Sequence, residues 1–254
     1  MAHDNWQVFL EVHEGARQQG PGSDETTERA LRALGSLPAS PHIVDMGSGT
    51  GRQTLALARR VPDARLTTVD AWPGFVKVLE QRVAAAGLAD RVSARVASMI
   101  DPGEIEPPAD LIWSEGAIYN VGVEAGLETF HGWLADGGGV AFSEVSWLVD
   151  LEAVPDEPRD FWLGEYPGIA TVEQNLERIQ RAGFEPLDHF VLPLSDWANY
   201  YDSLDEEQAK LASKYADDPE ALATLGSHAM ERDLLKRFSD AYNYVFYVAR
   251  KAGS

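Results

Sequence analysis

The sequence contains no cysteine among its 254 residues. Disulfide bonds, thiolate metal sites and a catalytic thiol are therefore excluded. Histidine offers no substitute as a metal ligand, because the six histidines show no paired spacing on one face of a predicted helix. We therefore expect no metal site. The histidines occupy positions 3, 13, 42, 131, 189 and 228.

Long apolar runs and basic residues are also scarce. No run has the length needed to cross a bilayer, and the first fifteen residues lack the basic start and apolar centre of a signal peptide. Lysine and arginine number 21 against 41 acidic residues, which gives a net charge of −20 and a pI near 4.5. Such a surface repels nucleic acids and anionic membranes. The sequence predicts a cytoplasmic protein that binds neither.

Glycines at alternate positions follow a short apolar strand. Ile43 and Val44 form the strand pattern, and the segment at residues 45–51 reads Asp-Met-Gly-Ser-Gly-Thr-Gly. Such glycines let the chain turn sharply and let a ligand approach the backbone. Thr50 is then expected to cap a helix whose free N–H groups face the turn. A second apolar run ends at Asp70, an acid able to accept hydrogen bonds from two ribose hydroxyls. Together they indicate a nucleoside cofactor.

The spacing of the glycines disfavours a dinucleotide. A pyrophosphate site uses Gly-x-Gly-x-x-Gly, whereas here Arg52 occupies the position of the later glycine. Asp45 is also a poor neighbour for a pyrophosphate and an acceptable one for a cation. Tyr119 and Tyr166 are not followed by lysine within one helical turn, which further disfavours a nicotinamide-dependent oxidoreductase. A non-catalytic module that binds a cofactor stays open as an alternative.

Residues 45–51 resemble the Asp/Glu-x-Gly-x-Gly-x-Gly motif of class I S-adenosylmethionine-dependent methyltransferases. Across residues 5–202 the chain also resembles a subgroup of bacterial methyltransferase-domain proteins with poorly assigned substrates. The segments that carry this likeness are QQGPGS at 18–23, IWSEGAIYNVG at 112–122, SEVSW at 143–147 and WLGEYPG at 162–168. The resemblance implies methyl transfer from S-adenosyl-L-methionine to a small-molecule acceptor by in-line displacement.

Predicted strands and helices alternate through residue 145, which is typical of an α/β protein with a parallel sheet. The resemblance implies a doubly wound, Rossmann-like sheet of seven mostly parallel strands, with the last strand antiparallel between the fifth and sixth. We expect one methyltransferase domain over residues 1–254, with a helical N-terminal cap at 1–40 and a helical insertion at 195–240 that forms a lid or the surface of a homodimer. Further strands are predicted at 65–70, 91–97, 109–113, 140–145, 186–192 and 241–250, and helices at 75–86, 127–134 and 172–182.

The resemblance also assigns cofactor contacts. The glycine segment would hold the methionine and ribose portions, Asp70 the ribose, and Trp72 the face of the adenine. Residues after the third strand would lie near the adenine amine, where Asp101 is the nearest acid. Arg17, Gln18 and Gln19 are candidates for the methionine carboxylate. The full set predicted to bind the cofactor is Gln19, Asp45, Gly47, Ser48, Gly49, Gly51, Asp70, Ala71, Trp72, Ser98, Met99 and Glu115.

The loop after the fourth strand is the predicted place for catalysis, because ligands of open α/β sheets lie beyond the carboxyl ends of the strands. Glu115 is predicted to act as a general base or to orient the acceptor, and Tyr119 and Asn120 to donate hydrogen bonds. The alternative is that Glu115 caps a turn and Tyr119 packs in the core. The Asn/Asp-Pro-Pro-Tyr motif is absent, which disfavours exocyclic amines of nucleobases and glutamine as substrates.

Aromatic side chains are concentrated in the segments that remain. If they line one cavity, they suit a small, flat or apolar acceptor or help to hold a cation. Packing in the core is the alternative for each of them. The residues predicted to bind the acceptor are Tyr119, Asn120, Trp147, Trp162, Tyr166, Trp197 and Tyr200.

Overall fold

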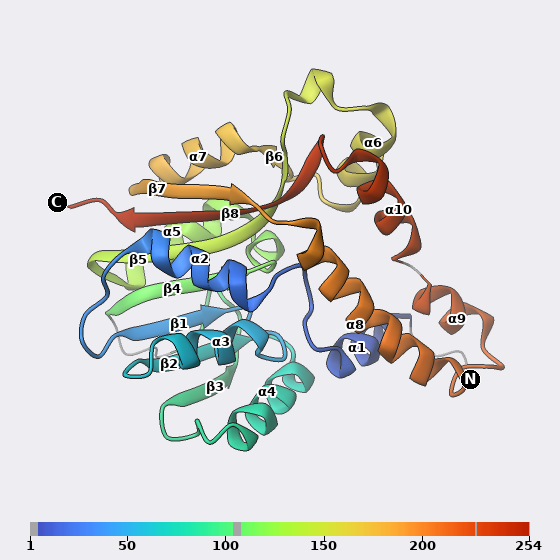
Figure 1. Ribbon diagram of the computed structural model, residues 1–254, viewed down its shortest axis with the longest axis horizontal. Helices are drawn as coiled ribbons and strands as arrows, with labels where there is room; N and C mark the ends of the chain where they lie inside the picture. Colours follow the sequence, from blue (N-terminus) through green and yellow to red (C-terminus); the bar gives the residue numbers. More distant parts are fainter. Residues whose placement is uncertain (1–4, 104–107, 227, 254) are drawn as a thin grey trace.

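The structure is a computed structural model that describes residues 5–103, 108–226 and 228–253 (Figure 1). Its centre is a sheet with strand order β3-β2-β1-β4-β5-β8-β7, and the short β6 lies beside β5. The strands are β1 (His42–Met46), β2 (Arg65–Asp70), β3 (Val92–Val96), β4 (Ala109–Glu115), β5 (Leu134–Trp147), β6 (Ala170–Thr171), β7 (Phe184–Val191) and β8 (Tyr242–Lys251).

The strand directions confirm the predicted α/β fold. β1 pairs in parallel with β2 and β4, and β4 in parallel with β5. β8 is antiparallel to both of its neighbours, β5 and β7. The chain therefore has the Rossmann-like methyltransferase sheet, with β6 as an additional short strand.

Helices cover both faces of the sheet. Buried side chains of α2 (Asp24–Leu34), α3 (Arg52–Arg60) and α4 (Pro73–Ala85) belong to one apolar cluster, and those of α5 (Val123–Trp133) and α7 (Val172–Arg181) to a second. The sheet separates the two clusters because side chains alternate along each strand. At Val140–Phe142, for example, Ala141 joins the first cluster while its two neighbours join the second.

The remaining helices lie mainly at the carboxyl ends of the parallel strands, on the right of Figure 1. α1 (Asn5–Gly15) packs against α8 (Leu194–Ala212) and α9 (Pro219–Leu225), and α10 (Ala229–Phe238) leads into β8. The N-terminal segment and the insertion before the last strand are thus helical, as predicted. None of the helices in the described part of the chain is long and apolar enough to cross a membrane.

Three local features differ from the sequence prediction. Residues 156–165 form α6 (Asp156–Glu165), which the sequence analysis did not predict. Pro158 would break the interior of a helix, but it lies in the first turn of α6, where proline is tolerated. β5 begins at Leu134 rather than at residue 140, since the three glycines before Val140 continue the strand with an irregular register against β4. Two short 3₁₀ turns, η1 (Ile118–Asn120) and η2 (Leu151–Ala153), complete the chain.

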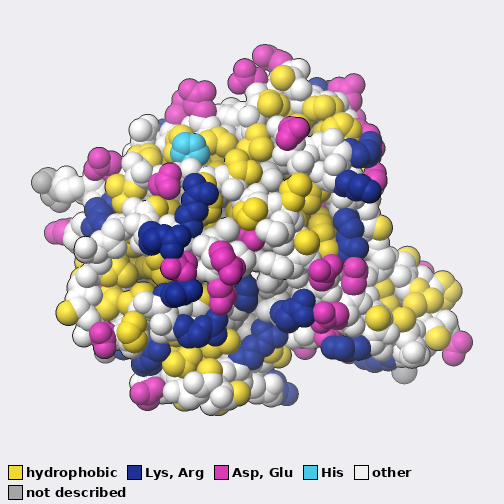
Figure 2. Space-filling view, viewed as in Figure 1, with side chains coloured by type: hydrophobic (Ala, Val, Ile, Leu, Met, Phe, Trp, Pro, Cys, Tyr) yellow, Lys and Arg dark blue, Asp and Glu magenta, His cyan; other side chains and the backbone are white. Residues whose placement is uncertain are grey.

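The face in Figure 2 shows basic and acidic side chains interspersed rather than gathered into single-sign patches. Many of these charges are paired on the surface, as in Arg59 with Asp24 and Arg60 with Glu28. The net charge of −20 therefore marks no acidic docking surface on this face.

Candidate active site

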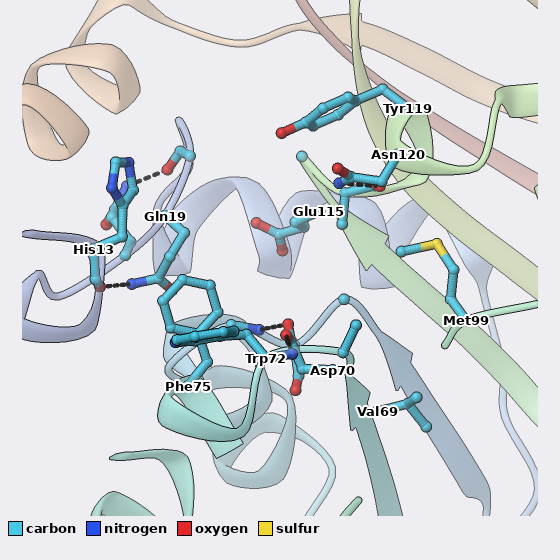
Figure 3. A pocket seen from close by; sticks show the side chains of 18 of the residues that line it. His13, Gln19, Val69, Asp70, Trp72, Phe75, Met99, Glu115, Tyr119 and Asn120 are labelled. Atoms are coloured by element: carbon cyan, nitrogen blue, oxygen red, sulfur yellow. Dashed lines mark hydrogen bonds between the residues drawn. The ribbon is translucent and has the colours of Figure 1, made fainter. Parts of the chain in front are cut away.

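A cavity of about 480 Å³ opens beyond the carboxyl ends of β1, β2 and β4. We call it the large cavity. Its walls come from the glycine segment, the end of β2, the loop after β4, helix α1 and residues 18–21. Figure 3 places Trp72 and Phe75 at one end and Tyr119 at the other, with Glu115 between them. The cavity thus lies where the sheet changes the direction of its strand order, the usual ligand position in open α/β sheets.

The close approach of the glycine segment to the loop after β4 requires glycine at position 47. Gly47 has a φ of 74°, and a Cβ atom on it would lie 2.3 Å from the Cβ of Ala117 in the loop after β4. The Gly47 and Ser48 N–H groups donate to the Val69 carbonyl at 2.8 and 3.1 Å, which ties the turn to the end of β2. Backbone of the turn therefore lines the cavity directly.

Asp70 links the glycine turn to the next loop. Its two carboxylate oxygens accept hydrogen bonds from the N–H groups of Gly49 and Trp72, each at 2.8 Å. Burial raises the pKa of this carboxyl group above its usual value. Both oxygens keep lone pairs for further donors on the cavity side, so Asp70 can accept hydrogen bonds from a vicinal diol.

Beyond Asp70 the cavity becomes apolar. Trp72 and Phe75 lie together on one wall, and Met99 projects from the opposite side (Figure 3). Ala71 and Ser98 also line this end. Asp101 forms an isolated bridge with Ser98 and is not among the described residues that line the cavity. A flat heteroaromatic ring is the ligand part that fits such walls.

Comparisons with known proteins agree with this arrangement. Residues 43–138 match the family model of a methyltransferase domain. The chain is thus similar to a methyltransferase domain from β1 into the start of β5. It is 34% identical over 122 residues to a trans-aconitate 2-methyltransferase of Paracidovorax citrulli, covering 46% of this chain and 45% of that protein. It is 33% identical over 170 residues to a biotin biosynthesis bifunctional protein of Bordetella avium, covering 60% and 35%. The chain spans less than half the length of these curated relatives.

Solved structures share the methyltransferase fold over nearly the whole chain. A methyltransferase from Thiobacillus denitrificans, in complex with S-adenosyl-L-homocysteine, has a TM-score of 0.81 at 17% identity and covers 98% of this chain and 99% of its own. One from Geobacter sulfurreducens, in complex with the same molecule, has a TM-score of 0.80 at 18% identity and covers 96% and 97%. The N-terminal helices and the helical insertion before β8 therefore belong to the shared fold.

Two residues of the methyltransferase motif stand behind the cavity rather than in its wall. The Asp45 carboxylate is fully buried and accepts hydrogen bonds from Thr54 and Gln53, which anchors α3 to β1. Burial raises the pKa of Asp45 to about 7. Gly51 caps α3, and a Cβ atom there would lie 2.8 Å from Leu79 Cγ of α4. Asp45 and Gly51 are thus not among the described residues that line the large cavity, and both hold α3 in place. Gly51, not Thr50 as predicted, is the N-cap residue.

Glu115 is held by donors on both oxygens. Oε1 accepts hydrogen bonds from Thr27 Oγ1 and Trp113 Nε1, each at 2.8 Å, and Oε2 forms an ion pair with Arg52. Both members of the ion pair line the large cavity and are largely shielded from solvent. These three donors favour a positioning role for Glu115 over that of a general base, which stays a prediction. Glu115 fixes the guanidinium of Arg52.

In the sequence, Arg52 stands out only because it occupies the position of a third glycine. Among the described residues that line the large cavity it is the one Lys or Arg. Its place directly after the last glycine of the turn was a usable signal, since the first turn of α3 must border the ligand. The side chain supplies a positive charge beside the glycine turn.

The N-terminal segment contributes more than the sequence suggested. The Gln19 amide donates to the His13 carbonyl at 2.7 Å and accepts from the Thr50 N–H at 2.8 Å, which joins α1 to the glycine turn. Gln18 also lines the cavity, whereas Arg17 pairs with Glu206 on the surface. Sequence reasoning missed the α1 wall formed by Trp6, Phe9, Leu10 and His13. The apolar stripe of α1 was the available signal.

A second cavity, of about 240 Å³, adjoins the first and is called the small cavity. The two share seven lining residues, including Gly20, Gly116 and Tyr119. A Cβ atom on Gly20 would lie 3.9 Å from the Cα of Gly116, so side chains here would narrow the passage between the cavities. Tyr119 borders both spaces, and desolvation raises the pKa of its hydroxyl above the usual value. It stays a neutral donor at physiological pH.

The structure divides the residues predicted to bind the acceptor into two groups. Trp162, Tyr166 and Tyr200 line the small cavity together with Tyr119. Asn120 lines the large cavity, where its amide donates to the Ala117 carbonyl at 2.9 Å.

Trp147 and Trp197 line neither cavity and pack in the core. Trp147 is 1% exposed and contacts the ring of Tyr242, and Trp197 donates to Asn243 Oδ1 at 2.7 Å. Their large apolar surfaces favour burial, which pattern alone cannot tell from a pocket. Within the described ranges, no group of three or more His, Asp and Glu side chains is placed to hold a metal ion.

Proposed function

We propose that this methyltransferase binds S-adenosyl-L-methionine in the large cavity and transfers its methyl group to a small molecule in the small cavity. The observation that carries the proposal is the Asp70 carboxylate, held between the glycine turn and Trp72 at the edge of an apolar end wall. A nucleoside needs such a pairing of a diol acceptor with flat apolar walls. The joined cavities support transfer between two ligands.

The lining residues match the parts of this cofactor in order. Asp70 accepts from the ribose hydroxyls, Trp72 and Met99 enclose the adenine, and the backbone of Gly47 to Gly49 borders the ribose and the methionine portion. Arg52 offers its guanidinium to the methionine carboxylate, an assignment supported by its place beside the turn. Glu115 keeps that guanidinium in position through the ion pair.

When bound, S-adenosyl-L-methionine supplies a methyl group on a sulfonium sulfur, open to in-line attack by a nucleophile. Tyr119 stands at the passage between the cavities and donates a hydrogen bond to the acceptor, which orients its nucleophilic atom. Aromatic walls of the small cavity exclude water from the passage. These residues align the acceptor, which is the main task left to the protein.

We further propose that residues 1–254 act as one domain, in which the cap at 1–40 and the insertion at 195–240 close over the ligands. Support comes from α1 and α8, which contact each other and both contribute lining residues. Closure by these two segments after both ligands have bound would shield the passage from water. Assembly into a homodimer and a location in the cytoplasm stay predictions from the sequence.

Calorimetric titration of ligand-stripped protein with S-adenosylmethionine, S-adenosylhomocysteine and NADPH tests the cofactor. We expect micromolar binding of the first two and none of NADPH. Transfer of a labelled methyl group to acceptors from a small-molecule panel then separates an enzyme from a binding module. Binding of NADPH alone, or of no nucleoside, would refute the proposal.

A further inference from the structure

The small cavity is built mainly from aromatic rings. Seven of its fifteen described lining residues are Phe, Tyr or Trp. Two of them, Tyr119 and Tyr166, meet edge to face with ring centroids 5.8 Å apart, and Phe161 and Trp162 meet likewise at 5.2 Å. Edge-to-face pairs set rings at steep angles to one another, so several ring faces can line one space. Ring faces carry negative electrostatic potential and attract cations.

The charged groups of this cavity have one sign. Glu165 of α6 and Glu231 of α10 line it, and none of its described lining residues is Lys or Arg. Burial, together with the nearby charge of Glu165, raises the pKa of Glu231 to about 7. Desolvation lowers the pKa of His228, which also lines the cavity, so its imidazole stays neutral and supplies no counter-charge at neutral pH. The phenols that face Glu231, including Tyr200 and Tyr244, have raised pKa values and stay neutral as well.

We propose that the small cavity selects an aliphatic amine, bound as its ammonium ion between the aromatic faces and the carboxylates of Glu165 and Glu231. This inference rests on the proposed function and narrows its acceptor class. A neutral aromatic acceptor would use the rings but would give the partly buried carboxylate of Glu231 no counter-charge, which is unfavourable. An ammonium ion engages both kinds of group at once.

The same residues account for the proton that an amine must lose. The bound ammonium gives one proton to the Glu231 carboxylate, which frees the lone pair on nitrogen. That lone pair forms the new N–C bond as the S–C bond of the methyl donor breaks, and the electrons of the broken bond stay on sulfur. The methylated ammonium and neutral S-adenosylhomocysteine then leave, and Glu231 returns its proton to solvent.

Two probes of matched shape test the inference by calorimetry. Choline is cationic, and 3,3-dimethylbutan-1-ol replaces its nitrogen by carbon; both are titrated with and without saturating S-adenosylhomocysteine. We expect choline to bind at least about tenfold more tightly, because a desolvated cation gains from aromatic faces and carboxylates. Choline cannot lose a proton, so proton release on its binding, measured in buffers of different ionisation enthalpy, reports the ionisation of Glu231.

The variant Glu231→Gln should lose both the preference for choline and the released proton while it still binds S-adenosylhomocysteine, which also shows that it folds. Glu220→Gln, an exposed change on α9 of the same insertion, is the matched control and should behave as the unmodified protein. Equal binding of the two probes, or an unchanged preference in Glu231→Gln, would overturn the inference and leave the proposed function intact. Choline binding without any binding of S-adenosylhomocysteine would instead refute the proposed function.

Discussion

The two joined cavities differ in how the chain builds them. Most residues that line the large cavity lie within residues 43–138, the segment that matches the methyltransferase family model. There, local turns place the lining residues within a few positions of a strand end. The small cavity draws on α1, α6, α8, α10 and β8, which are far apart in the sequence. A contiguous motif can specify the first kind of site. The second kind exists only once the helical additions have packed together.

This contrast has a chemical counterpart. Among the described lining residues, the large cavity has a cation, Arg52, beside two carboxylates and the backbone of the glycine turn, whereas the small cavity has two carboxyl groups and no Lys or Arg. Changes in one should therefore affect one ligand and spare the other. The following predictions test that separation.

The largest expected effect comes from Gly47→Ala. The new methyl group would lie 2.3 Å from Ala117 Cβ, in a backbone conformation that residues other than glycine rarely adopt. Since the turn must shift away from the loop after β4, we expect affinity for S-adenosylhomocysteine to fall by about 100-fold or more in calorimetry. The control is Gly132→Ala on α5, where a Cβ atom meets nothing within 4 Å. Unchanged affinity in Gly47→Ala would show that the turn does not shape the cofactor site.

Next in size is Asp70→Ala. Loss of the ribose acceptor should weaken binding of S-adenosylmethionine by about 1–3 kcal/mol, or about 5- to 150-fold. Choline should still bind, because Asp70 does not line the small cavity. The exposed Asp63→Ala serves as the control. Equal losses for both ligands would contradict the separation of the two cavities.

A smaller effect is expected for Glu115→Gln. If Glu115 positions Arg52, the amide should weaken cofactor binding by about tenfold, the value of one charged hydrogen bond, and leave the shape of the pH–rate profile unchanged. The control is the exposed Glu25→Gln on α2. A general base would behave in the opposite way. Intact cofactor affinity, with a fallen kcat and an ionisation missing from the profile, would restore Glu115 as the base.

The smallest effect concerns stability near the small cavity. Glu144 is buried on β5, its Oε2 atom has no hydrogen-bond partner among the described residues, and burial raises its pKa to about 8. Between pH 4.5, its ordinary pKa, and pH 8 the unfolded chain releases this proton while the folded protein keeps it, so rising pH destabilises the fold.

In Glu144→Gln, the side chain at position 144 no longer takes up or releases a proton on folding. The variant should therefore gain a few degrees in Tm relative to the unmodified protein at pH 8.5, with a smaller gain at pH 5. Thermal unfolding followed by circular dichroism measures both differences, and Glu128→Gln, exposed on α5, is the control. A gain that does not depend on pH would contradict the protonated state of Glu144.

Most strands and helices could be predicted from the sequence, because apolar periodicity and the glycines that end helices reflect local structure directly. The sequence predicted the antiparallel last strand through a family resemblance rather than through pairing preferences. The sequence could not tell which aromatic residues line a cavity and which pack in the core. Trp162 lines the small cavity whereas Trp147 and Trp197 are buried in the core, and nothing in their sequence surroundings separates the three. Glu231 gave no signal at all, since its importance arises from the packing of α10 against α6. Arg52 and Glu115 come together across 63 positions of sequence, a pairing that no motif shows.

A crystal structure of the protein with S-adenosylhomocysteine tests the central claim most directly. The account predicts adenine between Trp72 and Met99, the ribose hydroxyls on Asp70, and the sulfur atom facing the passage beside Tyr119. A sulfur atom that faces away from the small cavity, or a nucleoside bound elsewhere, would contradict the account.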